Sequence, residues 1–157
     1  MGLKGKLIAA VEFKLGGDLF HEHFRYKPHK ISTASPEKLH GCDLLEGEFG
    51  QLGSVMYATY TTDMINMRKK KKIKEVVTKI DEEKKLIEYE VLEGDLMEQY
   101  KAFTITIHVE TKNKIDLATW TLEYEMLNEE DVEHPISFLS FLLDLTKYVE
   151  THHKLNL

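Results

Sequence analysis

Apolar and polar residues alternate with a period of two over most of the chain, which is typical of β-strands. Between residues 3 and 13 the odd positions are mostly apolar, and lysine or glutamate occupies most of the even ones. Alternation, or a concentration of β-branched and aromatic residues, predicts six more strands, at 38–46, 54–61, 71–80, 85–93, 103–109 and 120–125. From residue 71 onward the connections are only a few residues long, which antiparallel pairing permits. The pattern therefore predicts an antiparallel meander of about seven strands.

Two short helical segments are expected between the first and second strands. Gly16 and Gly17 end the first strand, and Asp18 is placed to act as the N-cap of a helix over residues 18–24. A second helical turn is indicated in the polar stretch between Pro28 and Pro36.

The C-terminal segment changes to the period of an α-helix, and Pro135 is well placed as its first residue. Its polar residues recur at spacings of three and four and form one stripe, made of Ser137, Ser140, Asp144, Lys147 and Thr151. The rest of the helix surface is largely apolar, so we expect a curved sheet to wrap this helix on several sides.

Such a sheet either fills its interior with side chains or leaves a cavity between the sheet and the helix. The alternation places a set of large apolar residues on the inner side: Phe13, Phe20, Phe24, Tyr89, Phe103, Trp120, Phe138, Leu142 and Leu145. We take these as the candidate wall of a ligand-binding cavity, and core packing is the alternative for each of them.

The stretch EGEFGQLGS, residues 46–54, holds three glycines and raises the question of a phosphate-binding loop. A P-loop needs Lys followed by Ser or Thr at the start of a helix, whereas a predicted strand follows here. The chain contains no Gly-Lys-Ser or Gly-Lys-Thr, and Glu46 and Glu48 would repel phosphate. We therefore expect a hairpin loop in which the glycines adopt positive φ.

Composition limits the classes of function. The 157 residues are 42% apolar and show no break in composition, so one domain over residues 1–157 is expected. The net charge of −6 argues against a nucleic-acid partner, and no apolar run approaches the ~20 residues of a membrane span. Cys42 is the single cysteine, so no disulfide within the chain is possible, and we expect a cytoplasmic protein.

Candidate chemistry is sparse. His21, His23 and His29 lie close in sequence but lack the partner set of a zinc site, so we expect no metal and no cofactor. The one basic cluster, residues 68–72, is interpreted as a solvated surface, with contact to an anionic lipid left open. No nucleophile motif or carboxylate pair stands out, so the catalytic residues stay unknown. The polar residues to inspect for a catalytic role are His21, Tyr26, Tyr57, Tyr89 and Lys147.

Several segments together resemble the plant major latex protein family of the Bet v I superfamily, which also holds the pathogenesis-related class ten proteins. They are the opening MGLKGKL, the helix DLFHEHF, the segment KPHKISTASPEKLHGCDLLEGEFGQLGSV, the turn VLEGDL, the strand WTLEYE and the final helix. The resemblance covers essentially the whole chain in order. It implies an α+β helix-grip fold, in which a seven-stranded antiparallel curved sheet surrounds a long C-terminal helix and two short helices and encloses a large hydrophobic cavity.

The resemblance also implies a function. Most members of the superfamily are carriers, so binding of a small hydrophobic plant metabolite by a monomer or weak dimer is expected. A minority are catalysts, which makes the alternative a cofactor-free cyclase or isomerase of terpenoid, iridoid or alkaloid intermediates in the same cavity. A third hypothesis is a defence or regulatory protein that works through protein contacts. A polar group with a perturbed pKa facing the cavity would favour catalysis.

Overall fold

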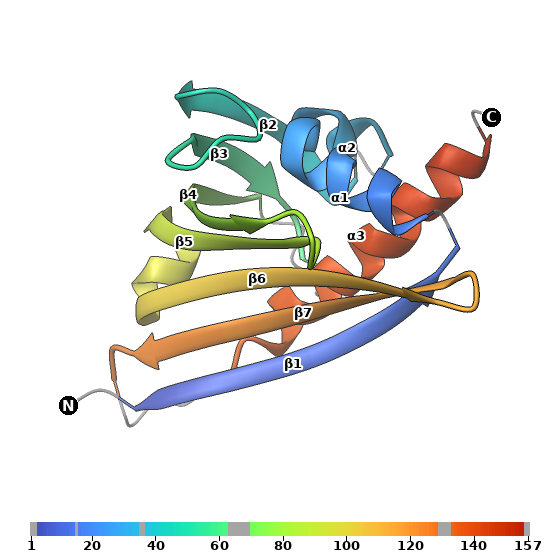
Figure 1. Ribbon diagram of the computed structural model, residues 1–157. Helices are drawn as coiled ribbons and strands as arrows, with labels where there is room; N and C mark the ends of the chain where they lie inside the picture. The colour runs from blue at the N-terminus through green and yellow to red at the C-terminus, as the bar shows by residue number, and fades with distance from the viewer. Residues whose placement is uncertain (1–2, 15, 35–36, 63–69, 129–132, 156–157) are drawn as a thin grey trace.

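All seven predicted strands form, and they pair into one antiparallel sheet (Figure 1). The computed structural model describes residues 3–14, 16–34, 37–62, 70–128 and 133–155. The strands are β1 (Lys4–Phe13), β2 (Leu39–Glu46), β3 (Val55–Tyr60), β4 (Lys71–Asp81), β5 (Leu86–Gly94), β6 (Tyr100–Lys112) and β7 (Ile115–Met126). The sheet is strongly curved, and the predicted α+β helix-grip fold is confirmed.

The strand order corrects the predicted meander. The order is β1-β7-β6-β5-β4-β3-β2, so β1 pairs with β7 and not with β2. The meander holds only from β2 to β7. β1 and β2 form the two edges of the sheet, because the two short helices between them in sequence carry the chain from one edge to the other (Figure 1).

β6 and β7 are longer than predicted. They meet at a tight turn in which Asn113 and Lys114 have φ values of 52° and 66°, the left-handed conformation that two-residue hairpin turns require. The residues on either side of this turn are mostly exposed, including Glu110, Thr111 and Lys112. Since neither face is buried there, the apolar alternation stops before the strands do.

The two short helices are α1 (Gly17–Tyr26) and α2 (Pro28–Ala34), and both confirm the prediction. The predicted N-cap is wrong. Gly16 occupies the N-cap position without a side-chain hydrogen bond, and Asp18 lies in the first turn. The Asp18 carboxylate instead pairs with Lys85, 3.2 Å from its Nζ. A side chain from β7 binds the backbone at the start of the helix: the Gly16 N–H donates to Asp116 Oδ2 at 2.8 Å.

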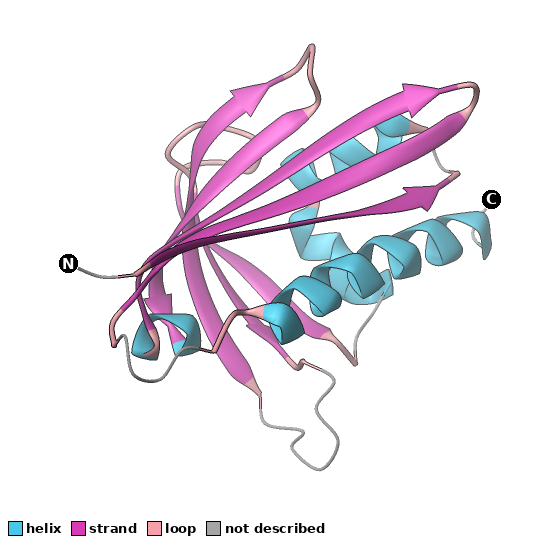
Figure 2. Ribbon diagram, turned by 90° about the horizontal axis from the view of Figure 1, so that it is seen from below, coloured by secondary structure: helices cyan, strands magenta, loops and turns pink. Residues whose placement is uncertain are grey.

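The long helix α3 (Ile136–Leu155) lies along the concave side of the sheet (Figure 2). It contacts β1, β7 and α2, and every member of the predicted polar stripe is exposed. The apolar arc is narrower than expected, because Ile136 and Tyr148 are 62% and 44% exposed. Within the described residues, no helix is both long enough and apolar enough to cross a membrane.

Candidate functional site

An apolar cavity lies between the sheet and the three helices. Its volume is about 80 Å³. That volume lies below the ~300–1,000 Å³ of typical small-molecule pockets, so a ligand of that size requires the wall side chains to move apart. The wall is made of Phe24, Pro28, Ile31, Leu39, Cys42, Met56, Ala58, Tyr60, Ile73, Glu75, Tyr89, Ile105, Trp120, Phe138, Phe141, Leu142 and Leu145. Six of the seven strands and all three α-helices contribute to it.

The predicted wall residues divide into two groups. Those that line the cavity are Phe24, Tyr89, Trp120, Phe138, Leu142 and Leu145. The structure places Phe13, Phe20 and Phe103 behind the wall, although all three are buried. Phe20 packs on Phe24 with ring centres 4.7 Å apart, and Phe103 meets Phe138 at 5.8 Å. Alternation therefore identified the inner face but not how deep each ring lies.

Tyr89 is the one member of the predicted catalytic set that lines the cavity. Its hydroxyl donates to the Phe24 carbonyl oxygen at 3.3 Å. Tyr57 follows Met56 and precedes Ala58, both of which line the cavity, so the alternation of β3 directs Tyr57 to the outer face. Tyr26 is 40% exposed and lies outside the wall.

The other two members of that set also lie away from the cavity. His21 is half-buried on α1, and burial together with the nearby Arg25 guanidinium lowers its pKa. Lys147 lies on the polar stripe of α3, where its Nζ donates to the Glu12 carbonyl oxygen at 2.9 Å and pairs with Glu150. Neither side chain can touch a molecule inside the cavity as the structure stands.

The strongest chemical group in the wall is one that the sequence argument missed, the Glu75 carboxyl on β4. Burial raises the pKa of this carboxyl to about 7. Burial also raises the pKa of the Cys42 thiol to about 12, and the Glu75 charge adds to that shift and to the raised pKa of Tyr89. The sequence feature that could have revealed Glu75 is the alternation of β4. Glu75 occupies the same face of the strand as the buried residues Ile73 and Val77, which is an inward position.

A second polar group of the wall is the Tyr60 hydroxyl on β3. The side chain is 1% exposed, and its ring lies 5.6 Å from the Phe138 ring and 5.2 Å from the Phe141 ring. The hydroxyl is buried and has no hydrogen-bond partner among the described residues. Burial, with smaller contributions from Asp95 and Glu75, raises its pKa, so the group stays protonated.

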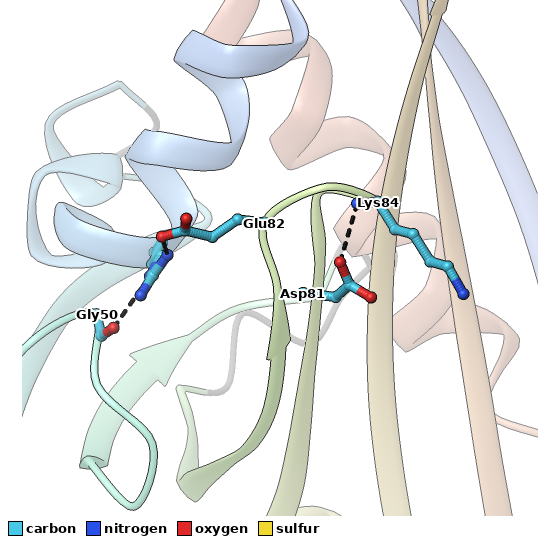
Figure 3. Close-up of polar contacts among 5 residues, drawn as sticks. Gly50, Asp81, Glu82 and Lys84 are labelled. Carbon is cyan, nitrogen blue, oxygen red and sulfur yellow. Dashed lines mark hydrogen bonds and ion pairs between the residues drawn. The ribbon is translucent and has the colours of Figure 1, made fainter.

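The glycine-rich stretch is the hairpin loop that the sequence predicts. Gly47, Gly50 and Gly53 have φ values of 77°, 86° and 81°, and the loop joins β2 to β3. Arg25 on α1 holds the loop, because its Nε donates to the Gly50 carbonyl oxygen at 3.0 Å. The same guanidinium pairs with Glu82 in the β4–β5 turn, so the loop, the turn and α1 meet at one point (Figure 3).

Gly50→Ala is expected to destabilise the protein by about 1 kcal/mol more than Gly53→Ala. Both positions carry the same positive-φ strain, but a Cβ at Gly50 would lie 2.3 Å from the Tyr26 ring, while nothing lies within 4 Å of one at Gly53. The alanine must therefore push Tyr26 aside and disturb the Arg25 contact. Urea denaturation of the two variants measures the difference, and equal midpoints would show that the loop does not need this close approach.

Two further expectations, the absence of a metal site and the solvated basic cluster, concern residues that the structure describes only in part. Within the described ranges, no group of three or more His, Cys, Asp or Glu residues is placed to hold a metal ion. Residues 68 and 69 of the predicted basic cluster lie outside the described residues, which resume at residue 70. The interpretation of that cluster as a solvated surface stays a prediction.

The family model of the pathogenesis-related protein Bet v 1 family matches residues 2–154. The chain belongs to this family. Within it, MLP-like protein 43 from Arabidopsis thaliana is 42% identical over 152 residues, which cover 96% of this chain and 93% of that protein. The crystal structure of major latex-like protein 151 from Panax ginseng has a TM-score of 0.90 and 43% identity, and the match covers 97% of this chain and 99% of that one. The major latex proteins are thus the Bet v 1 proteins that this chain resembles.

The Bet v 1 fold also extends to a protein named as an enzyme. The structure of norcoclaurine synthase from Thalictrum flavum, in complex with dopamine and hydroxybenzaldehyde, has a TM-score of 0.73. Its identity to this Bet v 1 family chain is 18%, with 96% of this chain and 89% of that one covered. This likeness shows a shared fold and nothing finer.

Proposed function

We propose that this Bet v 1 family member binds a small hydrophobic plant metabolite in its internal cavity, as a single ligand-binding domain. The observation that carries the proposal is the cavity itself, whose wall is mainly apolar and has few polar side-chain groups, those of Cys42, Tyr60, Glu75, Tyr89 and Trp120. Burial of apolar surface stabilises a complex by ~25 cal/mol per Å², before the costs of association are subtracted. A molecule that buries ~200 Å² there would gain ~5 kcal/mol.

We propose a cytoplasmic location because the chain has a single cysteine and so needs no compartment in which disulfides form. The Cys42 thiol is partly buried in the cavity wall, and its pKa is raised to about 12. The thiolate is the form that attacks disulfides, so a thiol of this kind is poorly suited to disulfide exchange.

Native mass spectrometry of the protein isolated from plant tissue tests the binding proposal. We expect a small molecule that stays bound in non-denaturing buffer and is lost on denaturation. A denatured sample of the same preparation serves as the control for covalent adducts. Absence of any retained molecule, together with a failure to take up neutral apolar probes, would contradict the proposal.

A second candidate function is a cofactor-free cyclase or isomerase acting on a terpenoid, iridoid or alkaloid intermediate. Glu75 favours it, because a carboxyl with a pKa of about 7 can both give and take a proton near neutral pH. The carboxylate would remove a proton from carbon beside a carbonyl group, and the resulting acid would return it at another atom. This proton transfer changes no oxidation state, so no redox cofactor is needed. The cavity wall would hold the substrate in a folded shape.

The likeness to norcoclaurine synthase supports the second candidate only as far as the shared fold goes. It indicates that this fold can be that of an enzyme. The decisive observation for this chain is therefore its own carboxyl, and replacement of Glu75 is the variant that separates a carrier from a catalyst.

A further inference from the structure

We infer that the Tyr60 hydroxyl is a ligand anchor: it donates a hydrogen bond to the carbonyl or hydroxyl oxygen of an uncharged ligand. The inference rests on the proposed binding function and deepens it, since it names the chemical class of the ligand. That class is a mainly hydrocarbon molecule with a neutral oxygen, such as a ketone, an aldehyde or an alcohol.

The first support is the state of the hydroxyl. Buried hydroxyls in proteins are nearly always hydrogen-bonded, because an unpaired one loses the interactions it had with water. The Tyr60 hydroxyl is buried without a partner among the described residues, and the residue is only 1% exposed. Among the described residues, Tyr60 is also the only one with such an unpaired side-chain atom that lines the cavity. A molecule in the cavity beside Tyr60 can supply the missing partner.

The second support is that the ring is held in place. Tyr60 packs against Phe138 and Phe141 of α3, with ring centres 5.6 and 5.2 Å away. On the sheet side, its backbone pairs with Lys71 of β4. A ring fixed in this way presents its hydroxyl at one position, which is what a specific hydrogen bond to a ligand requires.

The third support is a comparison with the other tyrosine of the wall. The Tyr89 hydroxyl donates to the Phe24 carbonyl oxygen at 3.3 Å, so its hydrogen bond is made within the protein. Tyr60 and Tyr89 thus share residue type, burial and cavity but differ in their partners. Tyr89 is a matched control for any effect of removing a phenolic oxygen.

The charge of the wall decides that the ligand oxygen is neutral. No lysine, arginine or histidine is present among the described residues of the wall, whereas the Glu75 carboxyl is. Lys38 is buried nearby in the fold, but its Nζ pairs with Asp144 at 3.3 Å and it is not part of the wall. A ligand carboxylate or phosphate would lose its hydration without gaining a counter-ion, and Glu75 would repel it when ionised.

The experiment compares wild type with Tyr60→Phe and Tyr89→Phe, using four ten-carbon probes: decane, 2-decanone, decan-2-ol and decanoate. Each probe displaces the neutral fluorophore 1-aminoanthracene from the cavity. We expect Tyr60→Phe to weaken binding of the ketone and the alcohol by about 3- to 10-fold and to leave decane unchanged. Decanoate at about pH 8 should bind wild type at least about tenfold more weakly than decan-2-ol.

The stability of the variants gives a second readout. If the Tyr60 hydroxyl only stabilised the fold, Tyr60→Phe would unfold at a lower urea concentration than wild type. Tyr60→Phe should unfold at the same urea concentration as wild type or at a higher one, because it removes an unpaired polar group. Tyr89→Phe should unfold at a lower concentration, because it removes a hydrogen bond within the protein.

The outcomes separate the inference from the proposed function. If Tyr60→Phe binds all four probes as wild type does, or unfolds as early as Tyr89→Phe, the anchor is wrong while cavity binding stands. Decanoate binding as tightly as the alcohol overturns the uncharged ligand class. If neither 1-aminoanthracene nor any probe binds wild type, the proposed function fails, and the inference fails with it.

Discussion

Glu75→Gln is expected to stabilise the protein at about pH 8 by about 2 kcal/mol and to flatten its pH dependence. Burial raises the pKa of Glu75 from 4.5 to about 7 in the folded protein. Over that interval the folded protein keeps a proton that the unfolded chain has released. Wild-type stability therefore falls as the pH rises from about 4.5 through about 7 and is level above that. The expected effect of about 2 kcal/mol is smaller than the full pKa shift would give, because the Glu75 side chain is partly exposed and solvent weakens the effect.

Urea denaturation at about pH 5 and about pH 8 measures this effect. Glu90→Gln is the matched control, because Glu90 is an exposed carboxylate on the neighbouring strand β5. The control should keep the wild-type pH dependence. An unchanged dependence in Glu75→Gln would mean that Glu75 ionises normally, and the acid–base role would then lose its basis.

The same variant decides the catalytic alternative. If the protein is a cyclase or isomerase that uses Glu75, Glu75→Gln should lower turnover of the reactive intermediate by about 10²- to 10⁴-fold. Binding of an uncharged substrate analogue should change little, because glutamine keeps the shape of the side chain. Turnover that survives the substitution would reject catalysis through this carboxyl and favour the carrier.

Ala58→Phe is expected to weaken ligand binding by roughly 100-fold or more. Ala58 lies in the cavity wall on β3, between the inward residues Met56 and Tyr60, and is 7% exposed. A phenyl ring at this position would fill the space that the ligand needs. Isothermal titration with a neutral apolar ligand measures the loss. The overpacking costs ~1–3 kcal/mol, so circular dichroism must show that the variant still folds.

Thr59→Phe is the matched control for Ala58→Phe. Thr59 is the next residue on β3, and strand alternation points its side chain to the opposite face of the sheet. Thr59→Phe therefore adds a ring of the same size outside the cavity and should leave ligand binding at the wild-type level. Equal affinities for the two variants would place the bound molecule somewhere other than the cavity.

The fold was predictable where the chain has one dry face and short connections. Alternation is strong in the centres of β6 and β7 and fades toward Asn113, where both faces are exposed. The pairing of β1 with β7 was not predictable from periodicity, because it depends on how α1 and α2 carry the chain across the sheet. Asp18 illustrates the same limit at short range, since a helix start at Gly17 leaves its carboxylate free to pair with Lys85.

The site was less predictable than the fold, because periodicity does not show which buried side chains line the cavity and which pack behind its wall. Phe20 and Phe24 are both buried, yet in the folded protein Phe24 lines the cavity and Phe20 packs behind it. Glu75 was missed because a glutamate in a lysine-rich strand is usually solvated, although its inward register was visible between Ile73 and Val77. The Tyr60 hydroxyl lacks a hydrogen-bond partner among the residues that the structure describes, and no sequence pattern records the absence of a neighbour.

Trp120 allows the most direct test of cavity binding, because it is the single tryptophan of the chain and it lines the cavity. Titration of wild type with 1-aminoanthracene should quench Trp120 emission saturably, with one probe bound per chain and energy transfer to the bound fluorophore. The quenching should disappear in Ala58→Phe and persist in Thr59→Phe. Trp120 emission that stays unchanged at saturating probe, or that is quenched equally in Ala58→Phe, would contradict binding in the cavity.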